Sequence, residues 1–297
     1  MEVITKIKQM QKRSDELRKE GKKIGFVPTM GTLHEGHLSL MRQAKLNNDV
    51  VIISIFVNPI QFVPGEDYQT YPRNFSRDEE LAEKVGVDII FYPEVEEMYP
   101  KKLLTFVEVE ELTKRLCGRF RPRHFRGVTT VVAKLFNITK PHTTYFGQKD
   151  YQQALAIKRI IEDLNFDIEM IIMPIVRNKN GLALSSRNVY LNKEETKAAL
   201  VLYKSLQQAK ELLDSGEKQA KKIISEMNNL IITENLAQPQ YIEIVDSQTL
   251  TPVELIEEEV LIALAVKIGK VRLIDNILWK NVIVNRRSRR EKLIAHR

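Results

Sequence analysis

The sequence predicts an α/β protein with a doubly wound, Rossmann-like parallel sheet, followed by a second, smaller α+β domain. Two observations lead to this prediction. Strand-like apolar segments alternate with segments of helical periodicity over the first 176 residues, which is typical of right-handed βαβ crossovers. Beyond Val176 the alternation ends, and two helical runs are followed by three short strand-like segments.

The expected strands of the first domain are short and apolar. The segment 50–56 (VVIISIF) is apolar almost throughout, as a parallel strand covered on both faces requires. The other strands are expected at 23–28, 88–91 and 167–174, and the helices at 38–47, 75–85, 128–139 and 151–164. Ligands of such sheets bind beyond the carboxyl ends of the strands, so the residues that follow each strand are candidate site residues.

The second domain is expected to begin with a polar loop at 177–188. Its helices are expected at 193–215 and 217–233, and its strands at 240–245, 260–266 and 270–274. We therefore divide the chain into a first domain at 1–176, a second domain at 177–285 and a basic tail at 286–297, which we expect to be disordered.

Composition limits the classes of function. The chain of 297 residues has a net charge of +7, but the tail carries six basic residues and one acid and so accounts for +5. The nearly neutral remainder excludes a general polyanion-binding surface, and nucleic-acid binding through the tail remains as an alternative. No apolar run approaches the roughly 20 residues that cross a membrane, and residues 1–20 lack a signal-peptide block. A single Cys117 favours a reducing cytoplasm.

The most informative segment is PTMGTLHEGH at residues 28–37, between the first expected strand and the first helix. Gly31 suits a tight turn, and we expect Gly36 to leave room for a nucleotide near the backbone. A helix N-terminus offers free N–H groups to phosphate, and His34 and His37 are spaced to face one ligand. Two surface histidines at a helix cap are the simpler alternative. Zinc binding is disfavoured, because the spacing differs from H-E-x-x-H.

Polar residues follow other expected strands. Asn58 and Gln61 come after the strand at 50–56, and side-chain amides donate hydrogen bonds without adding charge. A short strand-like piece precedes Lys149, which can offset phosphate charge, and Asp150, which can accept from a ribose or cap a helix.

The segment at 28–37 resembles the H-x-G-H motif of the nucleotidyltransferase superfamily, and VPTMGTLHEGHLSL resembles the pantothenate synthetase family in particular. Further matches follow in the same order, from about residue 22 to 276. They are SIFVNPIQF from Ser54, YPR from Tyr71, EMYP from Glu97, HFRGVTTVVAKLFNI from His124, YFGQKDYQQ from Tyr145, MPIVR from Met173, GLALSSRNVYL from Gly181 and RLIDN from Arg272. One residue departs from the family pattern, since Arg123 stands where glycine is expected and a positive φ there would be strained.

The resemblance implies roles for individual residues. Gln61 and Gln153 are expected to contact pantoate together with Asn58, and Phe62 to provide an apolar wall. Asp78 is expected to contribute to Mg²⁺ binding. The catalytic residues are expected to be His34, His37, Lys149 and Arg187. The expected ATP-binding residues are Met30, Gly31, Thr32, Leu33, His34, Glu35, Gly36, His37, Gly147, Gln148, Lys149, Asp150, Val176, Leu184, Ser185, Ser186 and Arg187.

The resemblance also implies a reaction. ATP would serve as a substrate together with Mg²⁺, and pantoate and β-alanine would be joined through a pantoyl-adenylate to give pantothenate, AMP and pyrophosphate. The protein is then expected to be a cytoplasmic homodimer without nucleic-acid or membrane partners. Two alternatives are an enzyme that stops at adenylyl transfer and a class I tRNA synthetase, the latter disfavoured by the short chain.

Overall fold

The computed structural model describes residues 1–280, so the expected basic tail lies outside the described residues. Two compact units form the chain. The first holds Met1–Asn178 with Ala183–Asn188, and the second holds Lys179–Leu182 and the described residues from Val189 onward. Within residues 1–280, no helix is both long and apolar enough to span a bilayer.

The first unit is built on a six-stranded sheet in which every strand pair is parallel. The strand order is β1-β4-β3-β2-β5-β6. The strands are β1 (Glu2–Ile4), β2 (Ile24–Thr29), β3 (Val50–Ile55), β4 (Ile89–Phe91), β5 (Thr143–Gly147) and β6 (Glu169–Met173). This topology confirms the predicted doubly wound α/β class.

The strand order places a topological switch point between β2 and β5. After β2 the chain adds β3 and then β4 on one side, whereas β5 and β6 are added on the other side. The connections that leave the carboxyl ends of β2 and β5 therefore run to opposite sides. Between such connections lies the crevice in which doubly wound sheets bind ligands.

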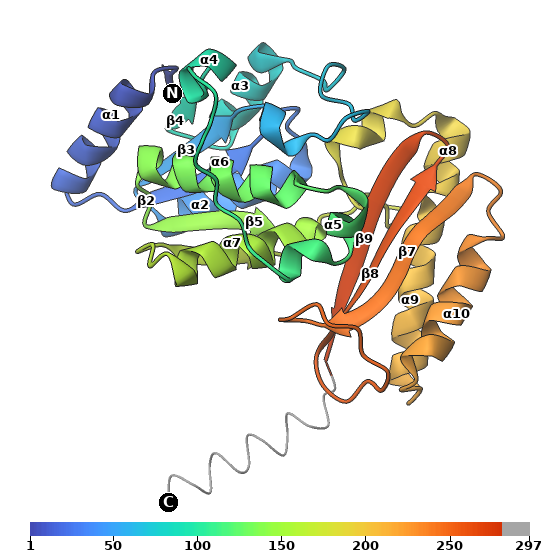
Figure 1. The fold of residues 1–297 in the computed structure, drawn as a ribbon. Coiled ribbons are helices and arrows are strands. Elements are labelled where there is room, and N and C mark those ends of the chain that lie inside the picture. Colours follow the sequence, from blue (N-terminus) through green and yellow to red (C-terminus); the bar gives the residue numbers. More distant parts are fainter. Residues whose placement is uncertain (281–297) are drawn as a thin grey trace, which may run out of the picture. The chain divides into compact units, whose positions relative to one another are not determined.

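Helices cover both faces of this sheet (Figure 1). They are α1 (Ile7–Lys19), α2 (Glu35–Asn47), α3 (Phe75–Lys84), α4 (Val95–Met98), α5 (Cys117–Phe120), α6 (His124–Thr139) and α7 (Tyr151–Asp163), with 3₁₀ turns η1 (Pro59–Gln61), η2 (Leu112–Lys114) and η3 (Gln148–Asp150). Neighbouring residues of β2 point to opposite faces: Phe26 packs edge-on against Phe136 of α6, and Val27 belongs to the core shared with α2 and α3. Both faces of the sheet are thus apolar, as the apolar sequence of its strands predicts.

The N-terminal elements β1 and α1 were not expected from the sequence. Helix α1 buries only Met10, Ser14 and Leu17, and most of its other residues are charged or polar. Its apolar stripe is therefore too narrow to give a clear helical period, and contacts with α6 hold it in place.

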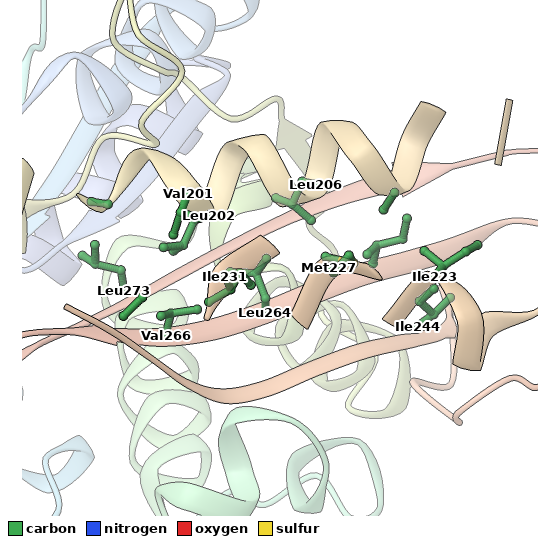
Figure 2. Close-up of a cluster of buried hydrophobic side chains, with 14 of the residues drawn as sticks. Val201, Leu202, Leu206, Ile223, Met227, Ile231, Ile244, Leu264, Val266 and Leu273 are labelled. Carbon is green, nitrogen blue, oxygen red and sulfur yellow. The ribbon is translucent and has the colours of Figure 1, made fainter. Parts of the chain in front are cut away.

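The second unit is a three-stranded antiparallel sheet of order β7-β8-β9, packed against helices. Its elements are α8 (Lys193–Ala198), α9 (Leu200–Asp214), α10 (Ala220–Ile231), β7 (Ala237–Asp246), β8 (Val260–Ile268) and β9 (Val271–Trp279). A 3₁₀ turn, η4 (Ser186–Tyr190), precedes them in the chain and begins in the first unit. Figure 2 shows how Leu206 of α9 and Met227 of α10 meet Leu264 of β8 in one apolar core. The predicted single helix at 193–215 is divided at Ala199.

Candidate active site

A cavity of about 230 Å³ opens at the switch point, beside the carboxyl ends of β2 and β5. Fifteen of the predicted site residues line it: Met30, His34, Gly36, His37, Asn58, Gln61, Gly147, Lys149, Asp150, Gln153, Val176, Leu184, Ser185, Ser186 and Arg187. The predicted residues outside this lining are Gly31, Thr32, Leu33, Glu35, Phe62, Asp78 and Gln148. The structure thus brings together side chains that lie up to 157 positions apart in sequence, from Met30 to Arg187.

The turn after β2 has a tightly constrained backbone. Gly31 has a φ of 81°, and an added Cβ would lie 2.8 Å from Oδ2 of Asp78. Thr32 also has a positive φ, 53°, which is costly for a β-branched residue. The carboxylate of Asp78 accepts hydrogen bonds from the backbone N–H groups of Thr32 and Leu33, both at 2.7 Å, and so holds the turn in this conformation.

These contacts bear on the predicted magnesium role of Asp78. Its side chain is 1% exposed, both oxygens accept backbone hydrogen bonds, and burial raises the pKa of the carboxyl group. This geometry favours a structural role for Asp78 over direct metal coordination. Across residues 1–280, no group of three or more His, Cys, Asp or Glu side chains is arranged to hold a metal ion.

The two histidines form the N-terminal cap of α2. The backbone N–H of Gly36 donates to Nδ1 of His34 at 3.1 Å, and the backbone N–H of His34 donates to Nδ1 of His37 at 3.4 Å. Because a backbone N–H can only donate, both Nδ1 atoms are acceptors, and each neutral ring carries its proton on Nε2. The ring centroids are 4.1 Å apart.

Both imidazoles are kept neutral at pH 7. Burial lowers the pKa of His34 to about 4, and the nearby charge of Lys149 acts in the same direction. Burial lowers the pKa of His37 well below its ordinary value, with His34 and Lys149 as smaller causes. Two neutral Nε2–H donors therefore belong to the wall of the cavity.

Gly36 has a role in the helix cap beside the predicted one. We expected it to make room for a nucleotide, but a Cβ at this position would lie 2.8 Å from Cε1 and 2.9 Å from Nδ1 of His34. Glycine lets the imidazole of His34 fold back over the first turn of α2, where its Nδ1 accepts from the N–H of Gly36. The cap thus gives a reason for glycine at this position, and Gly36 also lines the cavity.

Two cationic side chains join the histidines in the cavity wall. Lys149 follows β5 in η3, with its Nζ 3.5 Å from Oδ2 of Asp150. Arg187 donates to both oxygens of Asp67, from Nε at 3.0 Å and from Nη2 at 2.8 Å. Burial raises the pKa of the Asp67 carboxyl group, but the hydrogen bonds and charge of Arg187 outweigh burial and lower it overall. Arg187 thus starts from an ion pair, and an incoming anion would compete with Asp67 for it.

Much of the apolar part of the cavity comes from residues that the sequence analysis did not single out. Val128, Val131, Val132 and Leu135 lie on one face of α6 and line the cavity. Their spacing in the sequence is that of any helix face that packs into a core. The sequence pattern therefore could not show that these residues line a cavity. Phe62, which we expected in this wall, instead packs against Tyr68 and Tyr71, with centroid distances of 5.3 and 6.0 Å.

The arrangement suits a polyanionic ligand beside a small, partly apolar molecule. Neutral N–H donors at a helix N-terminus and two cations favour phosphate oxygens. Amide side chains and the valine-rich face of α6 offer polar and apolar contacts next to them. Three features define the class of this protein: the parallel sheet, the cavity at its switch point and the helix that is capped by histidines. It is an α/β protein of the nucleotide-binding, doubly wound type.

Comparison with known proteins then identifies the family. The model of the pantoate–β-alanine ligase family matches residues 2–278. The pantothenate synthetase of Thermotoga neapolitana is 57% identical over 278 residues, which cover 94% of this chain and 99% of the relative. That of Caldicellulosiruptor bescii is 56% identical with the same coverage. The chain belongs to the pantoate–β-alanine ligase family and is an enzyme, a ligase.

Solved structures agree with this assignment. The crystal structure of pantothenate synthetase from Thermus thermophilus is 42% identical, with a TM-score of 0.89 over 93% of this chain and 99% of that one. The pantoate–β-alanine ligase of Francisella tularensis, 39% identical, has a TM-score of 0.78 over 94% and 97% of the two chains. The crystal structure of that protein is of a complex with β-γ ATP and β-alanine.

Proposed function

We propose that the enzyme condenses pantoate with β-alanine at the expense of ATP, through a pantoyl-adenylate, and releases pantothenate, AMP and pyrophosphate. The main support is the pair of neutral imidazoles at the N-terminus of α2, whose Nδ1 atoms both accept backbone hydrogen bonds. Each ring therefore has an Nε2–H available for a phosphate oxygen. Membership of the family and the ligands of the Francisella relative support the choice of substrates.

In the first step, a carboxylate oxygen of pantoate attacks the α-phosphorus of ATP, and the bond to the bridging oxygen of the β-phosphate breaks. His34, His37 and Lys149 stabilise the charge on the phosphates, and Arg187 leaves Asp67 to contact the departing pyrophosphate. Gln61 and Gln153 orient pantoate, and the apolar face of α6 receives its dimethyl group. The proposed ATP-binding positions are the expected ATP-binding residues that line the cavity: Met30, His34, Gly36, His37, Gly147, Lys149, Asp150, Val176, Leu184, Ser185, Ser186 and Arg187.

In the second step, the neutral amine of β-alanine attacks the acyl carbon. The bond between that carbon and the phosphate oxygen breaks, AMP leaves with the electron pair, and the amine loses a proton. No covalent enzyme intermediate is needed, so the residues act by holding reactants in line and by stabilising charge.

Mg²⁺ would neutralise the leaving pyrophosphate. The cavity wall contains one carboxylate, that of Asp150, so the ATP phosphates would provide most of the ligands of the ion. We further propose a cytoplasmic homodimer without a nucleic-acid partner; Cys117, the single cysteine of the sequence, is buried and supports a reducing compartment.

Isotope transfer tests the intermediate. Pantoate labelled with ¹⁸O in its carboxylate should transfer one labelled oxygen to AMP when β-alanine is present, because the mixed anhydride is cleaved between carbon and the labelled oxygen. Pyrophosphate release should require pantoate. Label appearing in inorganic phosphate, with ADP as product, would instead show an acyl phosphate and refute the proposal.

Substitution of His37 tests the role of its Nε2–H. His37→Asn retains an acceptor close to the position of Nδ1 and removes Nε2–H, so adenylate formation in a single turnover should slow by about 10²- to 10³-fold. His37→Gln keeps a donor near the Nε2 position and should lose less. The control His142→Asn alters a histidine that accepts from the N–H of Ile24 at the start of β2, and should turn over like the wild type. Equal rates for His37→Asn and the wild type would contradict the assignment.

A further inference from the structure

The side-chain amide of Gln61 has a fixed orientation. Its Oε1 accepts from Nδ2 of Asn58 at 3.0 Å, and its Nε2 lies 3.0 Å from Sδ of Met30. A thioether sulfur is a weak acceptor, so the amide nitrogen keeps most of its donor capacity. Gln61 lines the cavity with only 9% of its surface exposed.

A backbone carbonyl of α6 sets the polarity of this contact. Nδ2 of Asn58 donates to the carbonyl oxygen of Gly127 at 3.1 Å, and a carbonyl can only accept. The nitrogen end of the Asn58 amide therefore faces α6 and Gln61, and its oxygen end faces the hydroxyl of Tyr99, which donates at 2.8 Å. Gly127 allows this approach, because a Cβ there would lie 2.3 Å from a carbonyl oxygen of η1.

These contacts use every hydrogen-bonding group of the Asn58 side chain. Both N–H bonds and the oxygen have partners, and the residue is 1% exposed. Asn58, which the sequence predicted to contact substrate, is thus placed to orient Gln61. Burial raises the pKa of Tyr99, so its hydroxyl retains the proton that it donates.

A second set of contacts holds the backbone of Gln61. Nδ1 of His124 is 2.7 Å from the carbonyl oxygen of Gln61 and must carry the ring proton, since the carbonyl only accepts. Nε2 of His124 then accepts from Nη1 of Arg121 at 2.7 Å, and the same guanidinium pairs with Glu66. Backbone and side chain of Gln61 are both held before any ligand arrives.

We propose that Tyr99 is a positioning residue for the acid substrate: through Asn58 it keeps the N–H₂ group of Gln61 turned into the cavity, so that this point of the site selects an oxygen acceptor. The assignment rests on the proposed function, in which Gln61 contacts pantoate. A carboxylate or hydroxyl oxygen of the acid satisfies the amide, whereas a donor group at the same point would leave it unpaired.

Two single substitutions test the relay, by which we mean the contacts from Tyr99 through Asn58 to Gln61. Tyr99→Phe should raise KM for pantoate about tenfold, the usual effect of one lost hydrogen bond, with kcat and the Kd of a non-hydrolysable ATP analogue within about twofold. Asn58→Asp should have a larger effect, because an oxygen would then face Gln61 and the amide would turn its own oxygen into the cavity. The control Thr130→Val deletes a partly buried hydrogen bond of 3.0 Å, which the N–H of Val107 donates to Oγ1 of Thr130 in α6. This bond lies outside the relay, so the control should leave KM unchanged.

A double-mutant cycle separates positioning from general destabilisation. If Tyr99 acts through Gln61, Tyr99→Phe should not raise KM for pantoate further in a Gln61→Ala background. Additive effects of the two substitutions, with normal turnover of the wild type, would overturn the relay alone. A wild-type enzyme without pantoate-dependent turnover would overturn the proposed function and the relay with it.

Discussion

The buried, neutral histidine of α6 should make the first unit sensitive to acid. Burial lowers the pKa of His124 to about 3, and the adjacent Arg121 acts in the same direction, whereas the ordinary value is 6.5. Below pH 6.5 the unfolded chain therefore takes up a proton that the folded protein does not. Stability from this group is fully present above pH 6.5 and falls by about 1.4 kcal/mol per pH unit as the pH drops toward 3. Between pH 7 and pH 5 the loss is about 2 kcal/mol.

The substitution His124→Asn isolates this contribution. It removes the titrating group and leaves a donor near the carbonyl oxygen of Gln61. The measurement is hydrogen exchange of the α6 amides, corrected for intrinsic rates, which gives the free energy of opening at each pH. From pH 7 to pH 5 this free energy should fall in both proteins, and the fall should be about 2 kcal/mol smaller in the variant than in the wild type. Amides of β8 in the second unit serve as an internal control. An equal fall in both proteins would refute the assignment of a neutral, buried His124.

Three further predictions follow from backbone and charge. Arg123 has a φ of 68° at the N-cap of α6, so Arg123→Gly should raise the free energy of unfolding by about 0.5–1 kcal/mol. This value is the strain that the substitution relieves, reduced by the cost of glycine's greater entropy in the unfolded state. A thermal melt checks it, and a lower Tm would contradict it. Gly127→Ala should destabilise the fold by about 1–3 kcal/mol in urea unfolding and raise KM for pantoate, because the added Cβ pushes α6 from η1. An unchanged KM would argue against the close contact. Asp67→Asn should tighten binding of an ATP analogue about two- to fivefold in calorimetry at low salt. The reason is that Arg187 no longer has to give up its ion pair with Asp67 in order to bind a phosphate. Weaker binding would mean that Asp67 instead positions Arg187.

Much of the site was predictable because its residues are local to strand ends. The segment from Met30 to His37 follows β2, and Lys149 and Asp150 follow β5. Ligands of doubly wound sheets bind beyond the carboxyl ends of the strands, so alternation of strands and helices was enough to mark both segments as candidates. That β2 and β5 are neighbours at the switch point comes from the structure. The expectation of a strained glycine position at Arg123 also agrees with its observed positive φ.

Other predictions depended on partners that no local pattern identifies. Asn58 was expected to contact substrate, but Gly127 and Tyr99 use its amide from positions 69 and 41 residues away. Asp78 was expected near a metal ion, but its carboxylate holds the turn at Thr32 and Leu33. A side chain's type is visible in the sequence, whereas its partner depends on which segments meet.

The amino-acid sequence alone was sufficient for the class of fold, the order of most elements, the family and the set of polar residues at the switch point. Periodicity and glycine positions are local properties, so one chain read from end to end contains them. Tertiary contacts were needed to assign the tautomers of His34, His37 and His124, the orientation of the Gln61 amide and the pairing of Arg187 with Asp67. A hydrogen bond has a direction set by both partners, and here the decisive partners are often backbone groups distant in sequence, whose positions follow only from folding.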